Sequence, residues 1–233
     1  MESSHAAQSI IKDLDVVSAR VPTHWRVYDG DFRPATRADH TFASDSEHVW
    51  NGSASAMLRV RYPDPPDVAN KRTSGIIQAA MAAPFTDKRI RFSAHLMTKG
   101  GTGALLCIRI LDYLGTLADL QCKHVDGNHR EMEWREEALI IDVPPESQTM
   151  LYGFVLTGQG YLWVDDVSLS VVDRDTPLTG KPIPLAQKTT GHFLLHELIL
   201  AAPANLDFEA TSEWTDDMIW DLRKQPAISL QDH

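Results

Sequence analysis

Two adjacent acids, Asp165 and Asp166, stand inside the run GYLWVDDVSLSVV, which otherwise has the apolar character of a buried strand. A carboxylate in such a place is costly unless it is solvated, accepts hydrogen bonds or binds a cation. Successive residues of a strand point to opposite faces, so only one of the two acids can serve a given site. We expect one acid to tie this strand to the N-terminal segment, through a structural Ca²⁺ or through backbone N–H groups, while the other faces water.

A second pattern with metal-binding residue types is GHFLLHEL, in which His192 and His196 would share one face of a helix and Glu197 follows directly. The order differs from the HExxH of zinc enzymes, and no spacing fixes a third ligand. We interpret the segment as a strap whose apolar residues dock on the rest of the protein, with its histidines on the surface.

Familiar catalytic motifs are absent from the sequence, which has no nucleophile elbow, GxGxxG run or P-loop. Cys107 and Cys122 lack CxxC spacing, so neither a disulfide nor a zinc site is expected, and Cys107 is interpreted as a packed thiol. These features favour a reducing compartment and predict a cytoplasmic protein.

The remaining candidates for a site are aromatic and polar side chains on strands expected to share one sheet. If Tyr152 and Arg109 point to one concave face, they form an amphipathic pocket that suits sugars or polycyclic small molecules. The alternative is that the aromatic residues form the core and Arg109 reaches out to solvent. The predicted ligand-binding set is Arg109, Gln121, Trp134, Tyr152, Phe154 and Trp163.

The elements that position these residues have a hydrophobic period of two, with glycine- and proline-rich turns between them. This pattern predicts an all-β fold, an antiparallel β-sandwich of jelly-roll type with short helical or extended termini. The clearest predicted strands are Ser53 to Tyr62, Arg89 to Thr98, Gly103 to Asp112, Glu137 to Val143, Thr149 to Gly158 and Tyr161 to Val172.

The sandwich is predicted to span residues 25–180, after an N-terminal segment of residues 1–24. Residues 181–233 are expected to form a strap, a closing strand and a short helix packed on the sandwich. The run SGIIQAAMAA fits a short helix or a buried strand. The tail TSEWTDDMIWDLRK, with Thr211 or Ser212 as helix cap, is predicted to be an amphipathic helix.

The formal net charge of −10 disfavours nucleic acid and anionic membranes as partners. No apolar run approaches the roughly 20 residues of a membrane-spanning helix. A small-molecule ligand is the expected partner, and the apolar tail offers a surface that can close a homodimer.

Several of these segments resemble a known family. They are Trp25, the Gly52 to Ala56 turn and strand, KRIRFSAHLMT, Trp134 before the Val143-Pro144 turn, YLWVDDV, and NLDFE as a short terminal strand. Together they are similar to the carbohydrate-binding-module-like (galactose-binding-like) β-sandwich appended to bacterial transcription regulators and hydrolases. The resemblance covers about residues 25–180 and implies a structural Ca²⁺ held by an acid of the last strand, with Asp13, Asp15 or Glu209 as its partners.

The resemblance leaves three functional hypotheses open, because sandwiches of this kind serve several functions. The leading one is binding of a carbohydrate or small molecule on a concave face. The second is a cyclase or isomerase of a natural-product pathway, with Tyr152 or a pocket carboxylate as proton donor and Arg109 orienting a carbonyl. The third is the effector domain of a regulator, although the 24 residues before Trp25 are too few for a helix-turn-helix reader.

Overall fold

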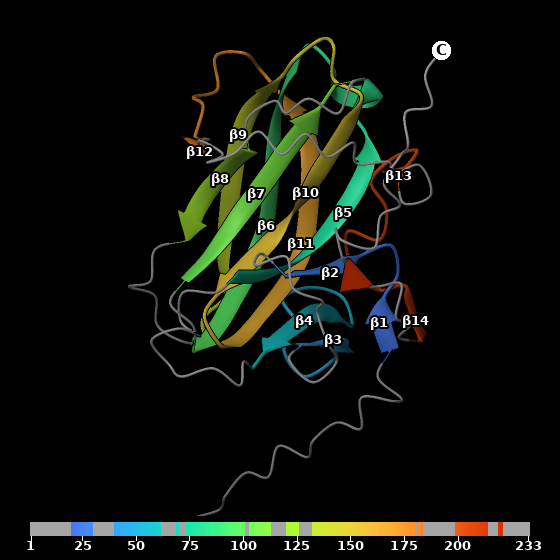
Figure 1. The fold of residues 1–233 in the computed structure, drawn as a ribbon, viewed down its shortest axis with the longest axis vertical. Helices are drawn as coiled ribbons and strands as arrows, with labels where there is room; N and C mark the ends of the chain where they lie inside the picture. Colours follow the sequence, from blue (N-terminus) through green and yellow to red (C-terminus); the bar gives the residue numbers. More distant parts are fainter. Residues whose placement is uncertain are drawn as a thin grey trace, which may run out of the picture.

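The alternating segments of the sequence form long antiparallel strands in the computed structural model. It describes residues 20–29, 40–61, 69, 73–100, 103–112, 120–125, 132–179, 181–183, 199–213 and 219–220. Two β-sheets pack face to face and make up the sandwich (Figure 1). The elements are β1 (Arg20–Pro22), β2 (Arg26–Asp29), β3 (His40–Asp45), β4 (Ser55–Val60), β5 (Thr73–Met81), the 3-10 turn η1 (Ala83–Phe85), β6 (Lys88–Gly100), β7 (Gly103–Leu111), β8 (Leu120–Val125), β9 (Arg135–Val143), β10 (Thr149–Thr157), β11 (Gly160–Val172), β12 (Lys181–Ile183), β13 (Ile199–Leu200), β14 (Thr211–Glu213) and β15 (Ile219–Trp220).

One sheet has the strand order β12-β8-β7-β10-β5-β2-β15, with β13 also paired to β5, and the other has the order β3-β4-β11-β6-β9. All their pairings are antiparallel except β13 with β5 and β15 with β2. The predicted all-β antiparallel sandwich is therefore confirmed, and the six strands expected most clearly lie within a few residues of β4, β6, β7, β9, β10 and β11.

The space between the sheets is filled by the apolar residues that the period-two pattern points inward. Trp25 is fully buried at the centre of an aromatic group, with its ring 5.9 Å from Tyr152, 6.0 Å from Phe154 and 5.1 Å from Phe208. Close packing of this kind makes each of these side chains costly to truncate.

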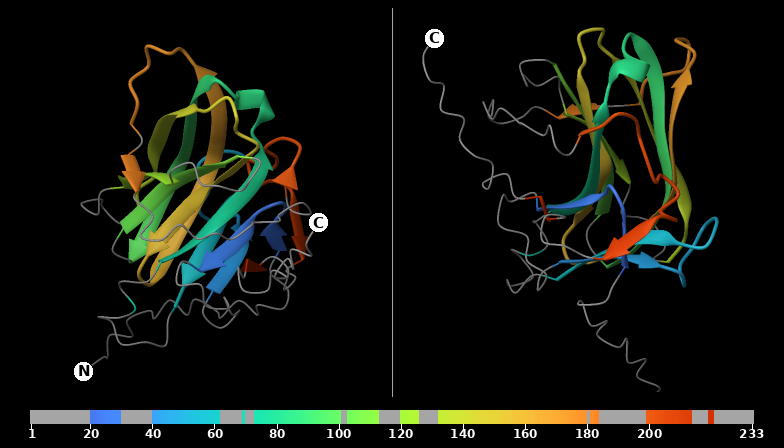
Figure 2. Two further views of the ribbon diagram at one scale, coloured as in Figure 1. Left: turned by 45° about the horizontal axis from the view of Figure 1, so that its top comes forward. Right: turned by 90° about the vertical axis from the view of Figure 1, so that its right-hand side faces the viewer.

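The C-terminal segment closes one side of this core. Residues 199–213 cross from one layer to the other on the side that faces the viewer in the right-hand view of Figure 2. They begin in β13 beside β5 and end in β14 against β1. Between these strands, Leu206 O accepts a hydrogen bond from the N–H of Val167 in the other sheet. Asn205 O also accepts the indole N–H of Trp25 at 3.1 Å.

Two expectations about local structure are revised, and one open alternative is decided. NLDFE, expected to be a strand, is a turn in which Asn205 and Phe208 have positive φ angles of 49° and 58°. The tail was expected to be helical from Thr211, but its described residues form strands β14 and β15. The ambiguous run SGIIQAAMAA is the interior strand β5, because pairing on both of its edges satisfies the backbone groups that a helix would have satisfied internally.

The expectation of free cysteines is wrong. Cys107 and Cys122 are direct partners in the register of β7 and β8, with their Cα atoms 4.2 Å apart, and they form a disulfide. Sequence spacing could not indicate this, because the two residues become neighbours only through strand pairing. Disulfides persist in oxidising surroundings, and the cytoplasmic location stays a prediction.

Candidate binding site

The loop between β3 and β4, residues 46–54, is held by three carboxylates that accept hydrogen bonds from its backbone. Asp45 accepts the N–H groups of residues 47 and 48 at 2.7 and 3.2 Å. Asp165 accepts those of residues 50 and 51 at 2.8 and 2.9 Å. Glu209 accepts those of residues 53 and 54 at 2.6 and 3.2 Å. Hydrogen bonds to an ionised acceptor are stronger than neutral ones, so this loop has a fixed conformation.

Asp165 is the central anchor of the loop. Its side chain is 1% exposed, and its second oxygen accepts the N–H of Asp166 at 2.7 Å. Burial raises the pKa of the Asp165 carboxyl, while the hydrogen bonds from Asn51, Trp50 and Asp166 act in the opposite direction. The acid within the strand thus accepts hydrogen bonds from backbone N–H groups, one of the two roles expected from the sequence. Among the described residues it holds the β3–β4 loop, while residues 1–19 of the N-terminal segment lie outside them.

The strand is irregular at this point, and the irregularity separates the two acids. The register of β11 with β6 shifts between Asp165 and Ser168, and Asp166 has a positive φ of 50°. A bulge of this kind redirects the side chains around it. Asp166 is exposed, and its carboxylate lies 3.4 Å from Nδ1 of His95.

The other two anchors have lowered pKa values. Burial pushes the pKa of Asp45 upward, but hydrogen bonds from Glu47, Trp163 and His48 outweigh it and leave the pKa below its usual value. Hydrogen bonds from the hydroxyl and N–H of Ser53 are the main cause of the lowered pKa of Glu209. Both groups therefore hold the loop as carboxylates at neutral pH.

This anchored loop presents an exposed aromatic side chain, Trp50. The indole is 50% exposed, and its ring stacks on the imidazole of His95 at a centroid distance of 4.1 Å and an interplanar angle of 14°. Large aromatic residues normally bury most of their surface, so an exposed indole on a rigid loop is a candidate for ligand contact.

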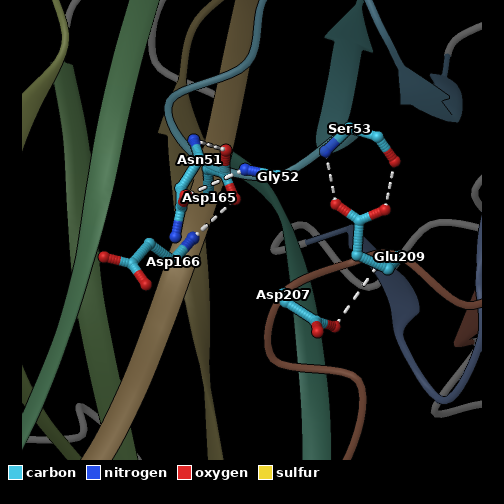
Figure 3. Close-up of a pocket in the computed structure, with 7 residues that line it drawn as sticks. All are labelled: Asn51, Gly52, Ser53, Asp165, Asp166, Asp207 and Glu209. Carbon is cyan, nitrogen blue, oxygen red and sulfur yellow. Dashed lines mark hydrogen bonds between the residues drawn. The ribbon is translucent and has the colours of Figure 1, made fainter.

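A pocket of about 340 Å³ lies where residues 51–53 of the loop, which follow Trp50 in the chain, meet the C-terminal turn (Figure 3). Apart from Asp165 its lining residues are solvent-exposed, so the pocket is open to solvent. The lining supplies carboxylate, amide and hydroxyl groups, which can bind a polyhydroxylated ligand. The lining residues are Asn51, Gly52, Ser53, Asp165, Asp166, Asp207 and Glu209.

A second aromatic group supports the start of the loop from the outer face of the five-stranded sheet. The indole N–H of Trp163 donates to Asp45 Oδ2 at 2.7 Å, and the ring of His48 lies 4.7 Å from that indole. Trp163 is buried against Ala43, Met57 and Met97, with Trp134 and Tyr161 packed around them. Trp163 and Trp134 are thus brought together on the side away from the core.

Of the other predicted ligand-binding residues, Arg109 points to the opposite face of the sheet from Gln121, Tyr152 and Phe154. Tyr152 and Phe154 are in the core between the sheets, at 1% and 0% exposure. The register sets Tyr152 opposite Ile108 and Arg109 opposite Leu151, so Tyr152 and Arg109 point to opposite faces. Gln121 lies on β8 opposite Ile108. The pocket that the sequence suggested for Tyr152 and Arg109 does not form.

Three of the proposed calcium ligands, Asp165, Asp166 and Glu209, line the same pocket, but two of them already accept hydrogen bonds from the protein. Both oxygens of Asp165 accept N–H groups, and Glu209 accepts the hydroxyl and N–H of Ser53. Asp13, Asp15 and the HxxxHE residues lie outside the described residues. Among the residues that the structure describes, no group of three His, Cys, Asp or Glu side chains could hold a metal ion.

Sequence reasoning missed Trp50 and His95 as site residues. The signal for Trp50 was present, because HVWNGS places a tryptophan beside an Asn-Gly turn, where burial is difficult. The signal for His95 was its place between the inward-facing Ala94 and Leu96 of β6, which directs it to the outer face. Nothing in the sequence could indicate that these two rings stack.

Comparisons with known proteins agree with the resemblance seen in the sequence. No family model matches the chain. A Bacillus subtilis protein, the uncharacterized HTH-type transcriptional regulator YbfP, is 28% identical over 169 residues, which are 71% of this chain and 51% of that protein. The chain therefore spans about half the length of this curated relative.

Similar solved structures include two carbohydrate-binding modules and a phage protein. The C-terminal family 22 module of Clostridium thermocellum Xyn10B has a TM-score of 0.43 and 14% identity, covering 67% of this chain and 94% of the module. TmCBM61, solved with β-1,4-galactotriose, has a TM-score of 0.42 and 11% identity over 65% of this chain and 91% of that one. The enzymatically active domain of bacteriophage CBA120 tailspike protein 4 has a TM-score of 0.49 and 16% identity, covering 64% of this chain and 20% of that one.

Among the described residues, no helix is long and apolar enough to cross a membrane.

Proposed function

We propose that this protein binds a carbohydrate, or a similar polyhydroxylated small molecule, at the pocket lined by residues 51–53, with the neighbouring Trp50 as an aromatic contact. The observation that carries the proposal is the anchoring of an exposed indole. Six backbone N–H groups of the β3–β4 loop are held by Asp45, Asp165 and Glu209. A loop fixed before binding loses little conformational entropy when a ligand arrives, which favours affinity.

The chemistry of the pocket supports the same ligand class. The flat indole can cover the apolar face of a sugar ring, while the carboxylates of Asp166 and Asp207 can accept its hydroxyl groups. The pocket is lined by the β3–β4 loop, the irregular part of β11 and the C-terminal turn, so the ligand would bind there and not on the concave face expected from the sequence.

Titration calorimetry with soluble oligosaccharides tests the proposal, beginning with xylohexaose and β-1,4-galactotriose. We expect Trp50→Ala to weaken binding at least tenfold, the loss of one well-placed aromatic contact. Leu178→Ala is the matched control, because Leu178 is 52% exposed and lies outside the pocket lining. Equal affinity of both variants would contradict the proposed site, and no binding of any sugar on a broad glycan array would contradict the ligand class.

A second candidate is the effector domain of a transcription regulator, and the observation that favours it is the match to half of the Bacillus subtilis regulator. The two candidates are compatible, because an effector domain can bind a sugar as its signal. In that case we expect the sugar to change the association state of the protein, measured by light scattering after size-exclusion chromatography. An unchanged mass with the pocket saturated would argue against this role.

The cyclase alternative lacks comparable support. Its version with Tyr152 as the proton donor needs this residue to face the same pocket as Arg109, but the two residues point to opposite faces. The hydroxyl of Tyr152 donates to Gln78 in the core, and burial raises its pKa well above its usual value.

A further inference from the structure

The anchoring of the β3–β4 loop fixes the backbone at Trp50 but does not fix the indole. Asp165 accepts the backbone N–H of Trp50, and this bond leaves both side-chain torsions of the tryptophan free to change rotamer. An indole that is half exposed would move among rotamers unless another side chain restrained it. A restraint therefore has to come from a contact made by the ring itself.

His95 provides that contact from a rigid part of the fold. Its ring is stacked on the indole at 4.1 Å, nearly parallel. The residue lies on β6, which is paired on both edges, with Asp165 opposite it on β11 and Glu136 opposite it on β9. The His95 side chain is only 14% exposed, so its ring has little room to turn.

The neighbours of His95 connect it to the pocket. Its Nδ1 atom lies 3.4 Å from the carboxylate of Asp166, which lines the pocket. Glu136 is held in turn by Arg91 at 2.5 Å. Since His95 covers one face of the indole, the 50% exposure of Trp50 has to come from its other face and its edges.

We propose that His95 is a positioning residue of this site, whose ring supports the indole of Trp50 from behind and leaves the opposite face for the ligand. The role of His95 in orienting the indole stands on the stacking geometry alone. Its effect on ligand affinity rests on the proposed function. Stacking is the contribution that matters, so an aromatic ring of similar size at position 95 retains it.

Indole N–H spectra test the orienting role without any ligand. The protein has six tryptophans, and the signal of Trp50 is identified by its loss in Trp50→Phe. We expect His95→Ala to shift and broaden this signal and to raise the quenching of Trp50 fluorescence by acrylamide. His95→Phe retains both properties near their wild-type values. His124→Ala, which removes an exposed histidine of β8, changes neither.

Affinity provides the second measurement, with xylohexaose and β-1,4-galactotriose as probes. We expect His95→Ala to bind the sugar that the wild type binds on the order of three- to tenfold more weakly, as an aromatic contact of ordinary strength implies. His95→Phe should stay within about twofold. Urea unfolding of each variant confirms that it is folded, so that a loss of affinity reports on the site.

Two results would overturn the proposal. One is an unchanged Trp50 signal and unchanged quenching in His95→Ala, which would show that the indole needs no support. The other is an equal disturbance in His95→Phe and His95→Ala, which would assign the effect to the imidazole nitrogens. If the wild type binds neither sugar, the proposed ligand class is contradicted for these probes, and the indole spectra still decide the role of His95.

Discussion

Two groups of aromatic side chains in this protein differ in how they are held. The core group around Trp25, with Tyr152, Phe154 and Phe208, is fixed by apolar packing and is almost fully buried. Trp50 is fixed from its backbone by carboxylates and is half exposed. An aromatic residue of a sandwich is therefore a candidate for ligand binding when its side chain is exposed and its backbone is anchored. The number of aromatic residues and their spacing along the strands do not identify it.

The largest expected effect is on the free energy of unfolding, which should fall much more when a residue of the core group is truncated than when Trp50 is. Phe208→Ala removes a fully buried ring that packs 5.1 Å from Trp25, and we expect it to lower the free energy of unfolding by about 3–5 kcal/mol. Trp50→Ala should change it by less than about 0.5 kcal/mol. Urea unfolding followed by circular dichroism measures both. Similar losses in the two variants would mean that Trp50 belongs to the core after all.

The next effect concerns the anchor of the loop. Asp165→Ala leaves the N–H groups of Trp50 and Asn51 without their acceptor, and we expect a loss of about 2–3 kcal/mol in the free energy of unfolding. Asp166→Asn is the matched control, because Asp166 is exposed and should cost less than about 0.5 kcal/mol. A stability of Asp165→Ala equal to that of the wild type would remove Asp165 from its structural role.

We expect a fall in pH to weaken the hydrogen bonds that hold the β3–β4 loop before it unfolds the core. A carboxyl whose pKa is lowered by folding stabilises the fold above its unfolded pKa, and that stabilisation is lost as the pH falls through the folded pKa. Glu209 and Asp45 are of this kind, with ordinary values of 4.5 and 3.8. The contribution of Asp165 to stability has the opposite pH dependence. Its pKa is raised in the folded protein, so protonation of Asp165 as the pH falls favours the folded form.

We therefore expect the Trp50 signal to change as the pH is lowered through the range below 4.5, while the far-ultraviolet circular dichroism of the strands is retained. Glu209→Gln should show part of the change already at neutral pH. Simultaneous loss of both signals in the wild type would mean that the loop and the core unfold as one unit.

The smallest expected effect is that of calcium. A cation at about a hundred times its dissociation constant adds roughly 2.7 kcal/mol to the stability of the state that binds it. Because the oxygens of Asp165 and the carboxylate of Glu209 already accept hydrogen bonds, we expect thermal melts in calcium and in chelator to coincide. A higher melting temperature in calcium, abolished by Asp165→Asn, would restore the metal interpretation.

The sequence was sufficient to predict most of the long strands, but not to predict which face of each strand points into the core. Alternation in KRIRFSAHLMT and in TMLYGFVLTG was enough to predict β6 and β10, because burial of one face imposes that pattern. It could not tell an inner face from an outer face, so Tyr152 was placed in a pocket. The short strand β3 was missed, since HTFASD alternates too briefly to stand out.

The site depended on contacts between distant segments, which one sequence does not encode visibly. The pair Asp165 and Asp166 was singled out because an acid in a buried strand needs partners, but the sequence did not say which of the two has them. The partners of Asp165 lie 115 and 114 residues away in the chain. Glu209 was selected as a metal ligand, whereas its function in the structure is to hold Ser53. Local patterns can show that a residue needs a partner, and only the fold shows which partner it has.

The bond between Glu209 and Ser53 also sets an order of assembly. The two residues are separated by 156 positions, and Glu209 belongs to the turn that closes the core with Phe208. During synthesis from the N-terminus, β3 and β4 leave the ribosome long before this turn exists. A nascent chain can therefore pair its strands early, but it acquires a finished β3–β4 loop only when the closing turn docks. Ligand binding at this loop would then become possible only after the closing turn has been synthesised and has docked.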